Sequence, residues 1–305
     1  MKNDVLFNCH YVSLSESLAG AQIFYNYSLA QFTTFGIGGR ADVVIFVNSL
    51  AQLTRGISFC REAKIRYIVL GKGSNCLIDS GEVHAVVFVT TKLDSVKVIG
   101  QKVIAQCGAS AIKVFSKCFE GRLVGGEFLS SIPASIGGAT AINAGCFGQE
   151  MSQIVSSVKV FDGKKEFCIS RQECEFNYRE SIIARSHLVA LETEMSLRLG
   201  TASEILQVAR SICQQKRATQ PLREHSAGSV FKRGSDFVPA KLIDDLGLKG
   251  LKIGGAQVSV KHAGFIVNDG TATSEDVLNL ISEIRKRVYL AYGKRLETEI
   301  VYIRG

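Results

Sequence analysis

Three glycine-rich segments of the sequence have the composition of backbone that binds a ligand. The first, residues 36–41 (GIGGRA), formally fits the dinucleotide fingerprint G-x-G-x-x-A. That fingerprint binds a pyrophosphate only where the loop leaves a strand and opens a helix. Here the loop leads into the apolar run at residues 42–47 (DVVIFV), which has the composition of a strand. The Rossmann interpretation is therefore rejected.

The second segment, residues 71–75 (GKGSN), lacks the four residues that a P-loop needs between its first glycine and its Gly-Lys-Ser/Thr end. It follows the apolar run at residues 67–70 (YIVL), and its two glycines allow a tight turn close to a ligand. Successive N–H groups in such a turn form an anion-binding nest, which Ser74 and Asn75 could extend. An ordinary connection between two elements explains the loop equally well.

The third segment, residues 131–148 (SIPASIGGATAINAGCFG), has almost no charge and is rich in small side chains. Small side chains over such a length favour a backbone that lies against a large planar or extended ligand. The alternative is a tight contact between a helix and a strand. That contact needs one or two glycines rather than several small residues in a row, so the ligand-binding interpretation is preferred.

The elements expected around these segments alternate in the first third of the chain. Residues 42–47, 67–70 and 85–89 have strand composition, and a helix is predicted from Ser49, as its N-cap, to about Lys64. Short strand candidates then follow at residues 95–99, 102–106, 157–161 and 188–199. This change of pattern predicts a mixed second layer.

The last third of the chain is expected to form a separate domain. It opens with a predicted helix at residues 203–216, and a second helix is predicted at residues 276–291. Thr273 and Asp276 have the spacing of a capping box at the start of that second helix. A final strand is expected at residues 299–303. The predicted fold class is therefore α/β combined with α+β.

Composition excludes several classes of protein. The chain has 305 residues, 46% of them hydrophobic, and a net charge of +8, which favours anionic small molecules. Its nine cysteines form no CxxC and its five histidines have no metal-ligand spacing, so we expect neither disulfides nor a metal. We expect no membrane helix, and the N-terminus has no secretory pattern, which predicts a cytoplasmic location. Nucleic-acid binding is the weaker alternative, because no basic helix or recognised motif occurs.

Taken together, seven segments resemble one family, the UDP-N-acetylenolpyruvoylglucosamine reductases, which are flavoenzymes of peptidoglycan precursor synthesis. Each segment alone is a weak signal, but all seven occur in the family's order between about Phe32 and Tyr302. The segments are residues 33–41 (TTFGIGGRA), 70–79 (LGKGSNCLID), 127–148 (EFLSSIPASIGGATAINAGCFG), 176–181 (FNYRES), 226–232 (SAGSVFK), 254–268 (GGAQVSVKHAGFIVN) and 296–300 (LETEI).

The resemblance implies an FAD-binding fold of the vanillyl-alcohol oxidase type, with two subdomains and a C-terminal α+β substrate domain. It places the FAD-binding region at residues 1–200, with subdomains at about 25–90 and 91–200, and the substrate domain at 201–305. The short link between Ser181 and Leu188 indicates the form that lacks an extra tyrosine-bearing loop. The implied FAD-binding residues are Gly71, Lys72, Gly73, Ser74, Asn75, Cys76, Leu77, Ser135, Ile136, Gly137, Gly138, Asn143, Ala144 and Gly145.

The resemblance further implies reduction of an enolpyruvyl ether on a UDP-sugar, with FAD as the hydride donor and NADPH as the reductant. Such a reaction needs a cation at the substrate carboxylate and a proton donor at the α-carbon. Arg179 matches the first role, because a guanidinium binds a carboxylate with two hydrogen bonds. Ser229 matches the proton donor, and a protonated Glu299 would donate to the developing enolate. Judged without the resemblance, all three would be assigned structural roles.

Tyr178, Lys232 and Arg233 are implied to bind the substrate, the last two at the diphosphate. Lys261 and His262 lie in a matched segment, and no role is assigned to them. Three positions depart from the family's pattern: Ala134 replaces a usual glycine, Thr298 a usual proline, and Gly234 a common proline. Two alternatives stay open: another FAD oxidoreductase that acts on a sugar or hydroxy acid, and an inactive binding protein.

Overall fold

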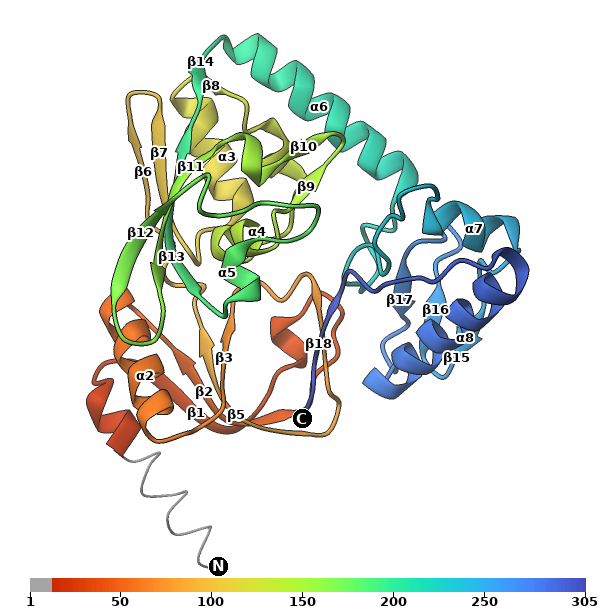
Figure 1. The fold of residues 1–305 in the computed structure, drawn as a ribbon, viewed down its shortest axis with the longest axis horizontal. Helices are drawn as coiled ribbons and strands as arrows, with labels where there is room; N and C mark the ends of the chain where they lie inside the picture. The colour runs from red at the N-terminus through yellow and green to blue at the C-terminus, as the bar shows by residue number, and fades with distance from the viewer. Residues whose placement is uncertain (1–12) are drawn as a thin grey trace, which may run out of the picture. The chain divides into compact units, whose positions relative to one another are not determined.

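The computed structural model describes residues 13–305 (Figure 1). Cys9, His10 and most of the N-terminal stretch considered for secretion lie outside the described residues. The chain forms two compact units, each built from segments that are far apart in the sequence. The described part of unit 1 comprises residues 13–27, 41–72 and 84–213, and unit 2 comprises residues 28–40, 73–83 and 214–305.

The first sheet of unit 1 confirms the alternating pattern predicted for the first third of the chain. It has the strand order β1-β2-β5-β3, and β3 runs parallel to β5. The strands are β1 (Gln22–Ser28), β2 (Arg40–Phe46), β3 (Tyr67–Leu70) and β5 (Glu82–Val89). The predicted helix is α2 (Leu50–Glu62), which begins where Ser49 Oγ accepts the N–H of Gln52 at 3.2 Å. Its buried Leu53, Ile57 and Cys60 lie one turn apart and form one face.

The second sheet of unit 1 is antiparallel, with the order β12-β11-β13-β7-β6. Its strands are β6 (Val96–Ile99), β7 (Lys102–Gln106), β11 (Val155–Phe161), β12 (Glu166–Ser170) and β13 (Val189–Ser196). The short strands predicted after residue 95 are confirmed. The last of them is divided, because β14 (Arg198–Leu199) leaves this sheet and pairs with β8 (Leu123–Val124).

Two helices that the sequence did not predict pack on this second sheet, α3 (Ala111–Glu120) and α4 (Ile136–Ala141). Ser110 caps α3 by accepting the N–H of Lys113 at 3.1 Å. The glycine-rich segment at residues 131–148 is thus partly helical. Shorter elements surround α4: η2 (Glu127–Ser131), β9 (Gly145–Cys146), β10 (Gln149–Glu150), η3 (Met151–Gln153) and α5 (Ile182–Arg185).

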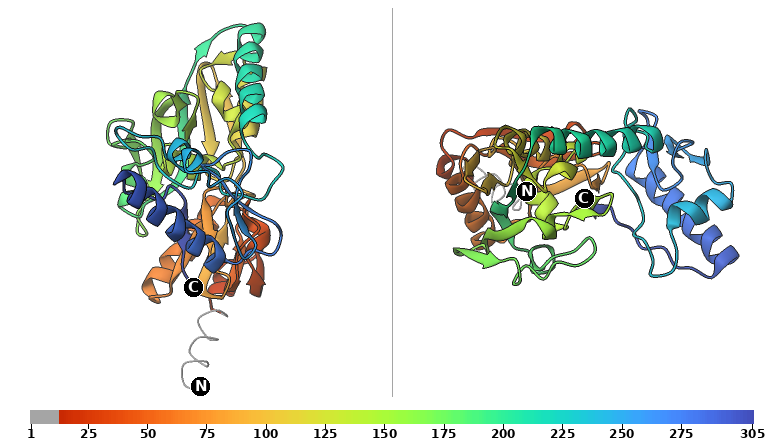
Figure 2. Two further views of the ribbon diagram at one scale, coloured as in Figure 1. Left: turned by 90° about the vertical axis from the view of Figure 1, so that its right-hand side faces the viewer. Right: turned by 90° about the horizontal axis from the view of Figure 1, so that it is seen from above.

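The long helix α6 (Ala202–Thr219) confirms the helix predicted at 203–216 and is continuous (Figure 2). Unit 1 ends within it, at Cys213. The domain boundary expected at residue 200 remains a prediction. The two compact units are not divided at a single position, because unit 2 also contains residues 28–40 and 73–83.

Unit 2 combines short strands with two helices and η1 (Ala30–Phe32). β4 (Cys76–Ile78) pairs in parallel with β18 (Val301–Ile303), which is shorter than the strand predicted at 299–303. An antiparallel sheet has the order β15-β16-β17. Its elements and the helices are β15 (Lys252–Ile253), β16 (Ala256–Val258), β17 (Ile266–Asn268), α7 (Pro239–Asp245) and α8 (Ser274–Tyr292). The predicted capping box is confirmed, with both hydrogen bonds between Thr273 and Asp276 formed.

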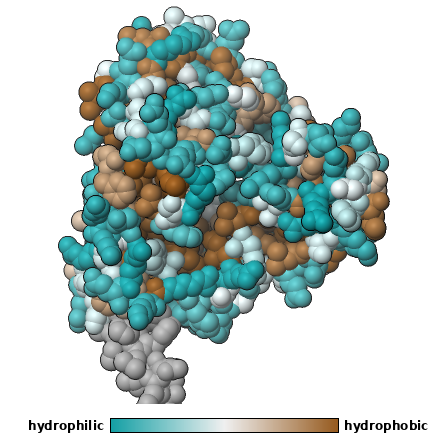
Figure 3. Space-filling model, viewed as in Figure 1, coloured by the Kyte–Doolittle hydropathy of each residue, from teal (hydrophilic) through white to brown (hydrophobic). Residues whose placement is uncertain are grey.

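Each unit has its own hydrophobic core. Unit 1 has one cluster around Phe128, Val158 and Met195 and another around Ile45, Ile57 and Phe88. The cluster of unit 2 joins segments from all parts of the chain, since Phe35 and Leu77 pack with residues of α8. Hydrophilic residues are spread over the face shown in Figure 3, with smaller apolar patches between them.

Candidate active site

The loop after β3 and the start of α4 are in direct contact within unit 1. A Cβ added to Gly71 would overlap Ser135 Oγ, so the glycine allows the two segments to touch. Ser135 is buried and immediately precedes α4. Two segments for which FAD binding was predicted therefore meet at these residues, although they are far apart in the sequence.

The rest of this loop belongs to unit 2 and has the properties of an anion-binding turn. Gly73 has φ +57°, and a Cβ there would overlap the carbonyl oxygen of Phe32. Its own carbonyl accepts the N–H of Thr34 at 3.1 Å. Among residues 13–305, no acceptor takes the backbone N–H groups of Gly73, Ser74 or Asn75. Three successive unused donors fit the pyrophosphate of a dinucleotide such as FAD.

Packing accounts for part of the small-residue segment. The N–H of Gly137 donates to the carbonyl of Cys107 at 2.9 Å, and a Cβ on Gly137 would lie 2.7 Å from Cys107 Cβ. Thr140 and Thr193 join α4 to β13 through their hydroxyls, 3.0 Å apart. The tight helix–strand contact considered from the sequence is therefore present at these positions. Gly138 is exposed, and its predicted role at the flavin remains untested.

Arg179 lies in a two-residue turn and has an unusual backbone conformation. Asn177 and Glu180 pair on either side of the turn through two backbone hydrogen bonds, 2.9 and 3.2 Å long. Arg179 has φ +58°, in the left-handed region that ordinarily favours glycine or asparagine. A non-glycine residue in that region costs on the order of 1 kcal/mol or more, and such residues are frequent at functional sites.

The guanidinium of Arg179 is oriented by two carbonyl groups and one ring. Its Nη2 donates to the carbonyl of Gly145 at 2.9 Å, and its Nη1 lies 3.5 Å from the carbonyl of Asn143. The ring of Tyr178 lies 5.2 Å from the guanidinium carbon, within cation–π range. The sequence left open a pair between Arg179 and Glu180, yet Glu180 accepts from Arg185 at 3.3 Å.

In unit 2, Ser229 and Glu299 lie on paired segments. Ser229 pairs with Phe265, and the adjacent Val230 accepts the N–H of Glu299 at 2.7 Å. The Asn75 side chain donates to the carbonyl of Glu299 at 3.2 Å, and the carbonyl of Asn75 accepts the N–H of Val301 at 2.9 Å. Three residues with predicted roles, distant in the sequence, thus belong to one hydrogen-bonded group.

The predicted diphosphate ligands follow on the same segment. The backbone N–H of Lys232 donates to the carbonyl of Glu297 at 2.9 Å, which continues the pairing. Lys232 Nζ lies 4.0 Å from the largely exposed Glu297 carboxylate, too far for a strong ion pair. Arg233 is exposed. Both cations are therefore accessible to a charged ligand.

His262, to which the sequence assigned no role, supports the strand beside Ser229. Its Nδ1 accepts the N–H of Gly264 at 3.1 Å, and its ring packs edge-on against Phe265 at 4.9 Å. Burial lowers the pKa of His262, so the neutral ring that accepts this bond is favoured. Because Phe265 pairs with Ser229, this histidine has a structural role that sequence spacing could not reveal.

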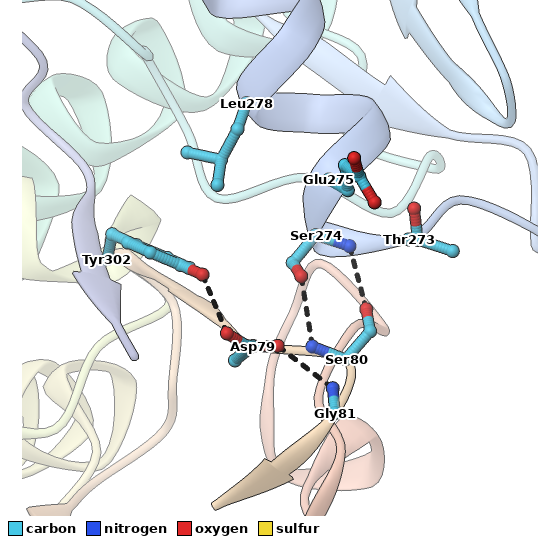
Figure 4. A pocket seen from close by; sticks show the side chains of 8 residues that line it. All are labelled: Asp79, Ser80, Gly81, Thr273, Ser274, Glu275, Leu278 and Tyr302. Atoms are coloured by element: carbon cyan, nitrogen blue, oxygen red, sulfur yellow. Dashed lines mark hydrogen bonds between the residues drawn. The ribbon is translucent and has the colours of Figure 1, made fainter. Parts of the chain in front are cut away.

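A cavity of about 470 Å³ in unit 2 is lined by eight residues, none of which is a predicted site residue (Figure 4). Ser80 and Ser274 exchange hydrogen bonds of 2.9 and 2.7 Å, each from a backbone N–H to the other hydroxyl. The N–H of Gly81 at 2.9 Å and the Tyr302 hydroxyl at 2.8 Å both donate to the Asp79 carboxylate, and these hydrogen bonds lower its pKa. These contacts attach the end of β4 and the last strand to the start of α8. They hold in place the strands next to Asn75 and Glu299.

The cysteines and acidic residues provide no metal site among the described residues. Burial raises the pKa of the Cys76 thiol to about 12, which keeps it neutral inside the predicted cofactor loop. Within residues 13–305, no helix is both long and apolar enough to span a membrane.

Comparison with known proteins agrees with this geometry. The family model described as UDP-N-acetylenolpyruvoylglucosamine reductase, C-terminal domain, matches residues 220–303, and the FAD binding domain model matches residues 41–167. The UDP-N-acetylenolpyruvoylglucosamine reductase of Caldanaerobacter subterraneus is 41% identical over 94% of this chain and 95% of its own length. The chain belongs to this reductase family. The UDP-N-acetylenolpyruvoylglucosamine reductase of Alkaliphilus oremlandii is 38% identical over 95% of this chain and 96% of its own length.

A solved structure supports the same conclusion. The reductase from Thermus caldophilus matches with a TM-score of 0.78 and 30% identity, and the match covers 93% of this chain and 98% of that one. The family and the flavin-binding fold that the sequence predicted are therefore confirmed. The roles of individual site residues remain predictions.

Proposed function

We propose that this chain is an FAD-dependent reductase that uses NADPH to convert UDP-N-acetylglucosamine enolpyruvate to UDP-N-acetylmuramate. Family membership over nearly the whole chain supports the activity. The observation that carries the assignment of residues is the group in unit 2. There Ser229 and Glu299 lie on paired segments, and Asn75 of the predicted cofactor loop donates to Glu299.

Arg179 binds the substrate carboxylate in this proposal. The intermediate of the reduction carries negative charge that is delocalised into that carboxylate, and a fixed cation stabilises the charge as it forms. The two carbonyl contacts restrict the guanidinium, so little reorganisation is needed when the charge develops. Bound FAD would supply the hydride for the terminal vinyl carbon, with NADPH as the source of its electrons.

Ser229 donates the proton to the α-carbon, and Glu299 in its protonated form donates to the carboxylate side of the intermediate. Tyr178 orients the substrate next to Arg179, and Lys232 and Arg233 bind the diphosphate. FAD is proposed to lie against residues 71–77 and 135–138 and against the backbone of residues 143–145. The substrate is a small UDP-sugar, and we propose a cytoplasmic enzyme that binds neither nucleic acid nor membrane.

Two measurements test this proposal. The purified protein should be yellow, and denaturation should release free FAD, because we expect no covalent attachment. NADPH and the enolpyruvyl UDP-sugar should then be consumed in equal amounts. A colourless protein that takes up no added FAD would refute the cofactor assignment. A yellow protein that oxidises NADPH only with oxygen would instead be another oxidoreductase of this fold.

A further inference from the structure

Asn143 is a buried polar residue that contacts both Arg179 and the turn that carries Arg179, although the resemblance places it only at the flavin. It is fully buried, and φ is +45°. Asparagine tolerates this left-handed conformation better than most residues, and glycine tolerates it best. The surrounding segment has glycine at several positions, and glycine would adopt this φ more easily. Backbone geometry alone therefore does not explain an asparagine here.

Both ends of the Asn143 side chain are used within unit 1. Its Oδ1 accepts the backbone N–H of Ser152 at 2.9 Å, and its Nδ2 donates to the carbonyl of Asn177 at 3.0 Å. Asn177 is the first residue of the turn that carries Arg179. The backbone carbonyl of Asn143 is in turn one of the two carbonyls near the guanidinium. One residue therefore contacts both the base of the turn and the side chain that the turn presents.

The other end of the turn is attached in the same way. Ser181 Oγ donates to the carbonyl of Ala141 at 2.6 Å, so both ends of the turn are bonded to the C-terminal end of α4. A turn with a strained arginine would relax if these bonds were absent. The Asn143 side chain is fully buried and each of its polar groups already has a protein partner, so it presents no exposed polar group to a cofactor.

We propose that Asn143 is a positioning residue for Arg179, and that its side chain sets the guanidinium for the substrate carboxylate rather than binding FAD. This inference rests on the proposed function. Asn143→Gly is the suitable variant, since glycine accepts φ +45° and keeps the carbonyl that Arg179 approaches. It removes the side chain with its two hydrogen bonds and leaves the backbone groups in place. Asn26→Gly is the matched control, because Asn26 has nearly the same φ, +46°, and no proposed role.

The test combines binding with the two half-reactions. Asn143→Gly should weaken calorimetric binding of the enolpyruvyl UDP-sugar about tenfold or more, the loss expected for a displaced charge-assisted contact. Binding of UDP, which has no carboxylate, should be unchanged, as should FAD content and reduction by NADPH. Reoxidation by the enolpyruvyl sugar should slow about tenfold or more. In the Arg179→Lys background the same change should add little further loss, because both changes remove one interaction.

Several outcomes would overturn the inference. One is an equal loss of UDP and substrate binding, and another is loss of FAD. The third is a double variant whose rate loss equals the product of the losses caused by Asn143→Gly and Arg179→Lys alone. If Asn143→Gly does not fold, Asn143→Asp keeps the acceptor for Ser152 and replaces the donor to Asn177 with an oxygen that the Asn177 carbonyl repels, and it should show the same pattern. Wild-type protein that does not turn over the enolpyruvyl sugar would refute the proposed function itself. Normal wild-type turnover with an unaffected Asn143→Gly variant would refute the positioning role alone.

Discussion

Replacing Arg179 with lysine keeps the positive charge and removes the planar guanidinium. The variant therefore separates the contribution of the charge from that of the planar hydrogen-bonding group. In the structure the guanidinium donates to Gly145 at 2.9 Å, approaches the carbonyl of Asn143 at 3.5 Å and lies 5.2 Å from the centre of the Tyr178 ring. A single ammonium cannot keep these contacts and also bind a carboxylate with two parallel hydrogen bonds. Losing one bidentate, charge-assisted contact in the transition state corresponds to about 3 kcal/mol, or roughly a hundredfold in rate.

Stopped-flow absorbance of the flavin measures this loss directly. Arg179→Lys should slow reoxidation by the enolpyruvyl sugar about a hundredfold or more and leave reduction by NADPH close to the wild-type rate. Arg185→Lys is the matched control, because Arg185 pairs at the surface with Glu175 and Glu180 and has no proposed catalytic role. A lysine variant with near-normal reoxidation would mean that Arg179 is structural or only attracts the substrate.

Three further predictions address the rest of the site. Ser229→Ala should leave reduction by NADPH within a small factor of wild type and slow reoxidation roughly a hundred- to ten-thousandfold; Ser229→Cys should recover part of the loss, and equal slowing of both halves would contradict proton donation. Gly71→Ala should lower FAD content and destabilise the fold by about 1–3 kcal/mol, because its Cβ would overlap Ser135 Oγ, whereas Gly121→Ala, where the nearest atom would lie 3.4 Å away, should be tolerated in thermal melts. Initial rates should give parallel double-reciprocal lines, since NADPH and the UDP-sugar must both reach one flavin; intersecting lines would show a ternary complex instead.

The elements that the sequence predicted are those with a local signal. Helix α2 was predicted from Ser49 and its apolar face, and α8 from the capping box at Thr273 and Asp276. Both signals act within one turn of helix, so they can be recognised without knowledge of the rest of the fold. Helix α4 was not predicted because its six residues are too few to show a period, and its two glycines and its threonine have low helix propensity. It forms because α4 packs on the second sheet, a contact that only the folded chain provides.

The arrangement of the site depends on distant contacts that the sequence does not display. Resemblance alone identified Ser229 and Glu299, and the backbone bond that relates them spans about 70 residues of chain. The left-handed turn at Arg179 also has no sequence signal, because arginine is not a residue that ordinarily marks positive φ. The positioning role proposed for Asn143 has no sequence signal either, because only the folded chain brings Asn143 next to its partners Ser152 and Asn177.

The three departures from the family's pattern can each be explained by backbone conformation or backbone hydrogen bonding. Ala134 lies outside the left-handed region, so the position does not need a glycine. Thr298 pairs with Phe231, but the bonds of that pair come from the N–H groups of Lys232 and Glu299. The pairing therefore does not use an N–H at position 298, which is the group that a proline would lack. Gly234 differs, because its N–H donates to the carbonyl of Phe237 at 3.1 Å and a Cβ there would overlap the Phe237 ring. The loop after Lys232 thus closes through a hydrogen bond that proline could not make, and the chemical groups proposed for the substrate are unaffected.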